Sequence, residues 1–190
     1  MGGAIGLRYV QTHPNQFRKA VFSSPMLRLD SGPIPRPVAQ VLVTSVNTVQ
    51  QWFSESAYFL GGHDYDATPF SENVLTSSKA RYDFFRDTYE KHPDLQLGSV
   101  TFNWIKESSE AIDKIYQDAA KIKIPYLILQ AGNEQVVDNA GQDEFCALED
   151  NKNCEYGVPL VITDGQHELF IERDELRNQA LNAIFAFFRN

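Results

Sequence analysis

Three glycines and one alanine lie within the first six residues of the chain and lead directly into an apolar stretch. Small residues at the start of a helix let its backbone approach a neighbouring backbone closely. The pattern therefore predicts a helix over residues 2–13, ended by Pro14, with its first turn pressed against another segment. An ordinary glycine-rich start, or a small-residue helix face packed on a sheet, is the simpler alternative.

Short apolar strands alternate with helices in the two ends of the chain. Strands are predicted at residues 19–24, 125–130 and 158–162, and further helices at 140–148 and 172–188. The strand at 125–130 is apolar almost throughout, which is typical of a strand that is buried on both faces of a parallel sheet. This alternation predicts an α/β fold with a parallel sheet.

The middle of the chain is rich in proline and in helical patterns instead. Helices are predicted at residues 37–53, 77–92 and 101–121, with a polar, turn-rich loop at 61–66. Such a stretch is best explained as a helical insertion into the sheet. We therefore predict an α/β core formed by residues 1–24 and 111–190, and a helical cap formed by residues 25–110.

Aromatic side chains recur on the predicted cap helices. Trp52 and Phe53 end the first of these helices, and Tyr82 and Phe85 share a face of the second. Packing within the cap is the simpler explanation of these four residues. If the segment covers an active site, they become candidate contacts for an acyl chain of a substrate.

Charge and composition exclude several classes of function. Seventeen Lys and Arg residues stand against 25 Asp and Glu residues, which gives a net charge of -8. This balance repels phosphate backbones, and no basic cluster offsets it, so we expect no nucleic-acid partner. No apolar run approaches the roughly 20 residues that cross a bilayer.

Cys146 and Cys154 are eight positions apart, with no second pair of cysteines nearby. A metal site is therefore not expected. The two cysteines could close a short disulfide loop or stay reduced, and we favour the reduced state slightly.

His167 is the strongest candidate for a catalytic group. It follows the last predicted strand directly, on the edge of the sheet where ligands collect in open α/β folds. The loop after the preceding strand holds Glu134 and Asp138, and a catalytic histidine needs an acid to fix its tautomer. The chain order of acid and histidine is that of α/β-hydrolases. A structural histidine is the alternative.

Several motifs, in this order, extend the resemblance over essentially the whole chain. They are MGGAIG at 1–6, LTSSKARY at 75–82, WIKES at 104–108, LILQAGNEQVVDN at 127–139 and DGQHE at 164–168. With these motifs the chain resembles the bacterial lysophospholipases among the monoacylglycerol-lipase-like α/β-hydrolases of serine aminopeptidase type.

The resemblance implies a partial α/β-hydrolase fold, with the last three parallel strands, their helices and an inserted helical cap. It also implies a carboxylic ester hydrolase without a cofactor, which releases a fatty acid from a lysophospholipid or monoacylglycerol through a Ser-His-acid triad. His167 would act as general base and then as general acid. Glu134 falls where related lipases carry the catalytic aspartate, and is favoured over Asp138.

The resemblance also makes Met1 and Gly2 the residues that follow the nucleophile in the Gly-x-Ser-x-Gly elbow. One oxyanion donor of the family then falls on the Met1 nitrogen, and the nucleophilic serine is not expected within the chain. Loss of a triad nucleophile costs about a million-fold in rate, so we expect residues 1–190 to be inactive alone. A related peptidase or small-ester esterase, or a non-catalytic binding or assembly module, is the alternative.

A sheet of three strands would leave the strand at 19–24 with an open edge, and we expect a homodimer through that edge, or aggregation. A lipid substrate implies peripheral contact with a membrane. The expected location is the cytoplasm or the periphery of the bacterial inner membrane.

Overall fold

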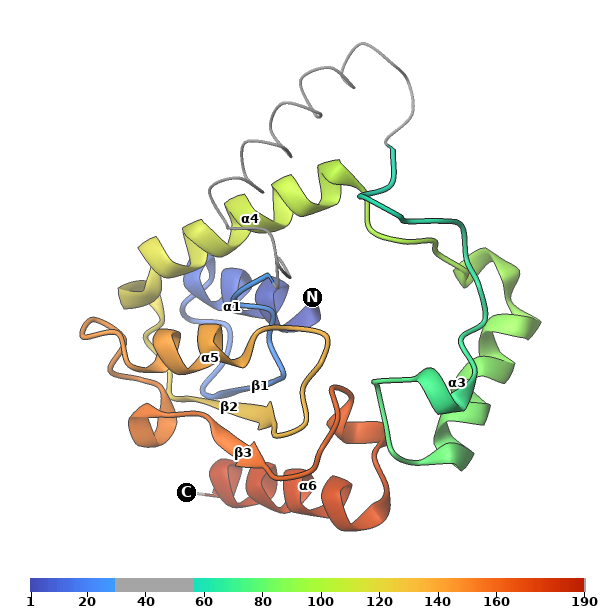
Figure 1. Cartoon of the computed structure of the whole chain (residues 1–190). Coiled ribbons are helices and arrows are strands. Elements are labelled where there is room, and N and C mark those ends of the chain that lie inside the picture. Colours follow the sequence, from blue (N-terminus) through green and yellow to red (C-terminus); the bar gives the residue numbers. More distant parts are fainter. Residues whose placement is uncertain (30–56, 190) are drawn as a thin grey trace.

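The computed structural model describes residues 1–29 and 57–189. Three strands form a parallel sheet in the order β1-β2-β3, namely β1 (Ala20–Ser23), β2 (Tyr126–Ala131) and β3 (Leu160–Ile162). The register pairs Ala20 with Tyr126, and Leu129 with Leu160. The parallel sheet with its flanking helices confirms the predicted α/β class (Figure 1).

The five described α-helices lie close to their predicted positions. They are α1 (Gly2–Thr12), α3 (Lys79–Lys91), α4 (Phe102–Gln117), α5 (Asn139–Cys146) and α6 (Asp174–Arg189). The helix predicted at 37–53, with Trp52 and Phe53, lies outside the described residues. None of the helices in the described ranges is long and apolar enough to cross a membrane.

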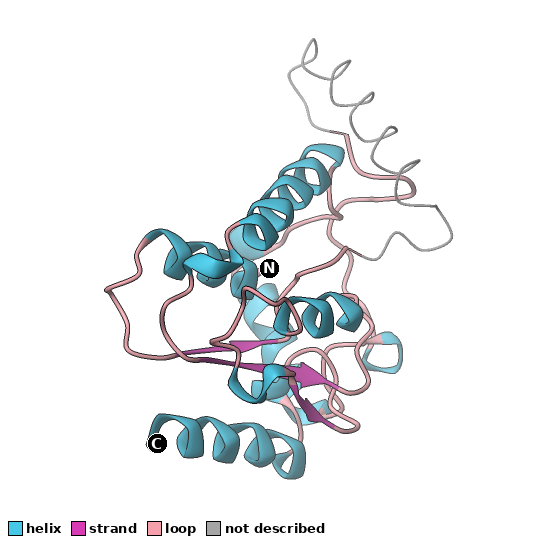
Figure 2. Cartoon of the chain, turned by 90° about the vertical axis from the view of Figure 1, so that its left-hand side faces the viewer, coloured by secondary structure: helices cyan, strands magenta, loops and turns pink. Residues whose placement is uncertain are grey.

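Helices cover both faces of the central strand β2, and for this reason all six of its residues are buried. On one face, Tyr126 and Ile128 belong to a core that α1, α4 and α5 complete. On the other face, Leu127, Leu129 and Ala131 pack with α6. Figure 2 shows the magenta strands enclosed between the C-terminal helix and the remaining helices.

The first turn of α1 is in close contact with the segment that follows β1. A Cβ atom added at Gly3 would lie 2.7 Å from Pro25 Cβ and 2.8 Å from Pro25 Cα. One at Gly6 would lie 3.0 Å from the ring of Phe22. The predicted close approach of the glycine-rich start is therefore confirmed, and Ala4 is buried in the core on the same helix.

Helix α4 crosses the predicted boundary between cap and core without a break. Near its start, the rings of Phe102 and Phe59 lie 5.1 Å apart, whereas Ile112 and Ile115 further along belong to the core beneath the sheet. The division at residue 110 remains a prediction.

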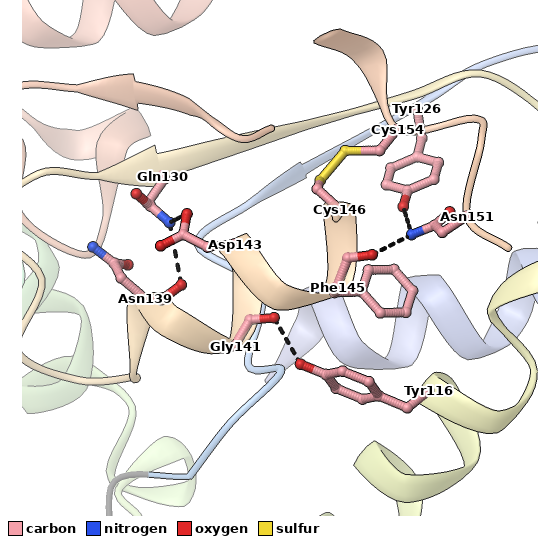
Figure 3. The surroundings of a disulfide bond; sticks show 10 residues. All are labelled: Tyr116, Tyr126, Gln130, Asn139, Gly141, Asp143, Phe145, Cys146, Asn151 and Cys154. Carbon is pink, nitrogen blue, oxygen red and sulfur yellow. Dashed lines mark hydrogen bonds between the residues drawn. A yellow bond between two sulfur atoms is a disulfide. The ribbon is translucent and has the colours of Figure 1, made fainter. Parts of the chain in front are cut away.

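The expectation of reduced cysteines was wrong. Cys146 ends α5 and forms a disulfide with Cys154, with the two Cα atoms 5.5 Å apart (Figure 3). The loop between them folds back on the sheet because Asn151 donates hydrogen bonds to the Phe145 carbonyl, at 2.7 Å, and to the Tyr126 hydroxyl. This path of the loop brings the two sulfur atoms together, and sequence spacing alone does not reveal it.

Strand β1 pairs with β2 on one side, and no other strand in the described ranges pairs with its second side. In the described ranges the edge predicted to be open is thus unpaired. Ile5, Tyr9 and Phe17, in α1 and the loop after it, are exposed by 62, 43 and 51%. A homodimer through this edge remains a prediction.

We expect Gly3→Ala to lower the free energy of unfolding by about 1 to 3 kcal/mol, since the added methyl group meets the backbone of Pro25 and forces it to move. Gly2→Ala is the matched control, because nothing lies within 4 Å of the added Cβ atom. Urea unfolding followed by circular dichroism measures both. Equal stability of the two variants would contradict the close contact.

Candidate active site

The loops that follow β2 and β3 bring Glu134 and His167 together. His167 Nδ1 lies 2.8 Å from Glu134 Oε2 and 3.0 Å from Oε1. The side chains are 13% exposed for His167 and 2% for Glu134. Since β2 and β3 are parallel neighbours, their carboxyl ends meet at one edge of the sheet, and this is why residues 33 positions apart are in contact.

Backbone hydrogen bonds fix the two loops to each other. Gly132 N donates to Ile162 O at 2.9 Å, and Asn133 N donates to Gly165 O at 2.8 Å. A Cβ atom at Gly132 would lie 3.0 Å from the Ile162 carbonyl oxygen, so the approach of the two loops depends on glycine there. Hydrogen bonds between the two loops therefore hold the backbone that carries Glu134 and His167.

The Glu134 carboxylate is held by its own loop. Oε1 accepts hydrogen bonds from the backbone N–H groups of Val136, at 2.7 Å, and Gln135, at 3.0 Å. Burial opposes ionisation of this carboxyl, but the hydrogen bonds from His167 and from the backbone outweigh it and hold the pKa of Glu134 below its ordinary value. Glu134 is therefore ionised at neutral pH.

An ionised acceptor at Nδ1 determines which nitrogen of His167 can act as a base. The carboxylate accepts only, so the Nδ1 atom must carry the proton, and the lone pair of the neutral ring is on Nε2. This is the tautomer that a histidine needs for general-base catalysis, with the acid behind it to stabilise the imidazolium.

Asp138 contacts other groups than His167. Its Oδ1 accepts from Ala140 N at 3.0 Å as the N-cap of α5, and its Oδ2 lies 3.4 Å from Arg28 Nη1. Within the described ranges, His167 forms hydrogen bonds with Glu134 alone. The geometry thus joins Glu134, and not Asp138, to the histidine, while the catalytic roles of both remain predictions.

The charges of two carboxylates act on the N-terminus of α1. Burial lowers the pKa of the Met1 amino group, and the negative charges of Glu168 and Glu134 oppose that shift in part. Met1 O accepts from Ala4 N at 2.9 Å and so begins the helix. The positive end of the α1 dipole is at this terminus. The added Cβ position of Gly2 faces open space.

Sequence reasoning missed Glu172, whose carboxylate is fully buried. Its Oε1 accepts from Gln166 N at 2.9 Å, and its Oε2 accepts from the Ser77 backbone and hydroxyl and from Arg173 N. One carboxylate thus joins the residue before His167 to the segment that leads into α3. Four donors compensate the cost of burying the charge.

Three further contacts connect the same two segments. Glu168 N donates to Leu75 O at 2.9 Å, Thr76 Oγ1 donates to Ile171 O at 2.7 Å, and Arg81 forms an ion pair with Asp174. Residues 75–81 are therefore attached directly to the histidine loop and to the segment that leads from it into α6. The LTSSKARY motif marked residues 75–82 as part of the family resemblance. The motif did not predict that this segment contacts the histidine loop.

The predicted acyl-contact residues divide into three groups. Tyr82 is 2% exposed, and its hydroxyl donates to Thr68 O at 2.7 Å, so it packs inside the protein. Phe85 lines an open depression beside α3. Trp52 and Phe53 lie outside the described residues.

Among the described residues, no group of three or more His, Cys, Asp or Glu side chains is arranged to hold a metal ion. The site can act as a general base. Nε2 of His167 accepts the proton, and the ionised Glu134 carboxylate binds Nδ1 and orients the ring.

A parallel sheet with an acid and a histidine on consecutive carboxyl-end loops is the arrangement expected of the α/β-hydrolase class. Residues 1–174 match the family described as serine aminopeptidase, S33, and the chain belongs to this family. It is 34% identical over 190 residues to lysophospholipase L2 of Escherichia coli strain K12. The aligned region covers 99% of this chain and 55% of that protein. It is 31% identical over 188 residues to the probable lysophospholipase L2 of Haemophilus influenzae. The chain thus spans about half the length of these curated relatives.

Solved structures support the same fold. The monoacylglycerol lipase of Paleococcus ferrophilus matches with a TM-score of 0.67 at 17% identity, over 97% of this chain and 63% of that one. A soluble variant of the monoglyceride lipase of Saccharomyces cerevisiae matches with a TM-score of 0.67 at 19% identity, over 97% of this chain and 58% of that one. The predicted partial α/β-hydrolase fold is confirmed.

The lowered pKa of Glu134 predicts a pH-dependent contribution to stability. Because the folded pKa lies below the unfolded one, the ionised carboxyl stabilises the folded state above the ordinary value of about 4.3, and this contribution is lost as the pH falls through the folded pKa. The stability advantage of the chain over Glu134→Gln should persist from pH 7 to about pH 5 and shrink below it. Urea unfolding across this range measures it.

The exposed Glu149→Gln is the control for the loss of one negative charge, and should change the stability little. An advantage over Glu134→Gln that grows as the pH falls from 5 to 3 would show that Glu134 is not held ionised in the folded protein.

Proposed function

We propose that this chain supplies the histidine and the acid of a serine hydrolase that releases a fatty acid from a lysophospholipid or monoacylglycerol. The contact between His167 Nδ1 and the ionised Glu134, which leaves Nε2 as the base, carries the proposal. The family match and the two relatives that are named lysophospholipase L2 support the choice of reaction.

The proposed reaction has two steps. Nε2 of His167 accepts the proton of a serine hydroxyl while the serine oxygen attacks the ester carbonyl carbon. The imidazolium, stabilised by Glu134, then donates this proton to the leaving glycerol oxygen, and an acyl-enzyme remains. In the second step His167 activates water in the same way, and the fatty acid and the free serine are released.

We place the nucleophile of the intact enzyme directly before Met1, because the MGGAIG start leads straight into α1, as the residues after the elbow serine do in the family. In a continuous chain this nitrogen is a peptide N–H. It would donate to the oxyanion of the tetrahedral intermediate, supported by the positive end of α1. Met1 and Gly2 thus keep their proposed place in the elbow.

The remaining parts of the proposal concern the surroundings of the enzyme. Phe85, with Trp52 and Phe53, is the proposed acyl contact, and peripheral membrane contact follows from the lipid substrate. The disulfide between Cys146 and Cys154 weighs against the cytoplasm, since disulfides persist in oxidising compartments. A location at the periphery of the inner membrane therefore stays as the proposal.

The test is a chimera in which the N-terminal part of the E. coli lysophospholipase L2, up to the residue aligned before Met1, precedes residues 1–190. The chimera should release fatty acid from lysophosphatidylcholine, whereas residues 1–190 alone should not. His167→Ala should lower kcat about a million-fold, and Glu134→Gln about ten-thousand-fold.

Asp138→Asn serves as the control at the competing acid and should retain activity within about tenfold. Hydrolysis that survives His167→Ala, or a folded chimera without any esterase activity, would contradict the proposed function. A greater loss in Asp138→Asn than in Glu134→Gln would move the role of the acid to Asp138.

A further inference from the structure

The histidine loop makes a sharp turn before it reaches His167. Asp164 has a φ angle of 64°, in the left-handed region that residues with a side chain adopt rarely. Gly165 N donates to Ile162 O at 3.0 Å and closes this turn. Backbone in such a region persists only where the surrounding structure holds it. The contacts on either side of His167 therefore determine where its ring lies.

The backbone N–H groups of both neighbours of His167 are bonded to acceptors outside the turn. Gln166 N donates to Glu172 Oε1, and Glu168 N donates to Leu75 O, each at 2.9 Å. Neither acceptor is the proposed triad acid. The backbone that carries the base is thus held on two sides by contacts that are separate from the hydrogen bond at Nδ1.

The Glu172 carboxylate also holds the segment that provides the second of these acceptors. Its Oε2 accepts from Ser77 N at 3.1 Å and from the Ser77 hydroxyl. Ser77 follows Leu75 by two residues, and Leu75 O binds the N–H group after His167. One side chain therefore fixes one neighbour of His167 directly and the other through residues 75–77.

The choice of a carboxylate at this position follows from these contacts. The Glu172 side chain is fully buried, and no ion pair within residues 1–29 and 57–189 includes it. Burial of a charge without a cation is costly, and only N–H and O–H donors compensate it here. A carboxylate has two acceptor oxygens and no donor, whereas an amide would turn its NH₂ group toward one of these donors.

We propose that Glu172 is a positioning residue for the base of the reaction. By holding both neighbours of His167, its carboxylate keeps Nδ1 at Glu134 and keeps Nε2 aligned with the serine. A misplacement of about 1 Å in such a group can cost roughly a hundredfold in rate. The inference rests on the proposed function and gives Glu172 no contact with the substrate.

The first test needs no hydrolysis. In residues 1–190 carrying Glu172→Gln, the low-field Nδ1–H proton of His167 should exchange with water about tenfold faster or more, because the loop opens locally. Glu175→Gln makes the same chemical change at an exposed position of the next helix and should leave the exchange rate unchanged. Circular dichroism shows whether both variants are folded. An unchanged rate in folded Glu172→Gln would overturn the proposal.

Kinetics of the chimera give a readout that a merely structural role would not change. Glu172→Gln should lower kcat for lysophosphatidylcholine about tenfold to a hundredfold and leave KM within about threefold, because the base is displaced and substrate binding is not. Equal kcat per folded molecule in Glu172→Gln and Glu175→Gln would overturn the proposal. An unsubstituted chimera without activity contradicts the proposed function instead, and the exchange rate in residues 1–190 then decides the positioning.

A second pair of variants decides the question if Glu172→Gln does not fold. Ser77 is exposed, and Ser77→Ala removes its hydroxyl donor to Glu172. Ser78→Ala is the matched control, because the Ser78 side chain makes no capping hydrogen bond. Ser77→Ala should lower kcat about threefold or more and speed the exchange at His167 Nδ1, while Ser78→Ala should do neither. Equal behaviour of the two serine variants would then overturn the proposal.

Discussion

The hydrogen bond between Glu134 and His167 is the contact on which the rest of the site depends. Both side chains are largely removed from solvent, so a carboxylate left without its partners would destabilise the protein by several kcal/mol. The backbone donors of the Glu134 loop and the ring of His167 prevent this cost and at the same time set the tautomer of the ring. Structural stability and chemical competence thus come from the same contact.

The parallel pairing of β2 with β3 makes this contact available, because it brings two loops from distant parts of the chain to one edge of the sheet. A second buried carboxylate, Glu172, acts on the other side of the histidine loop. It accepts hydrogen bonds from Gln166 N in that loop and from Ser77 before α3. The segment that leads into α3 and the loop that carries the base therefore share one buried charge.

Local patterns were sufficient to predict the apolar strand at 125–130, the helix over 2–13 and the placement of His167 after the last strand. They left Glu134 and Asp138 open, and only the family resemblance favoured Glu134. In the structure Asp138 caps α5, whereas Glu134 contacts His167. The disulfide and the burial of Glu172 depend on how loops fold over the sheet. Periodicity carries no information about such tertiary contacts, nor about which of many acidic residues is buried.

The most direct test of the account is the proton NMR signal of the His167 ring in residues 1–190. The account predicts a low-field Nδ1–H proton, protected from exchange by its hydrogen bond to Glu134, which is lost in Glu134→Gln and kept in Asp138→Asn. A signal that persists in Glu134→Gln and disappears in Asp138→Asn would contradict the pairing on which the site is built.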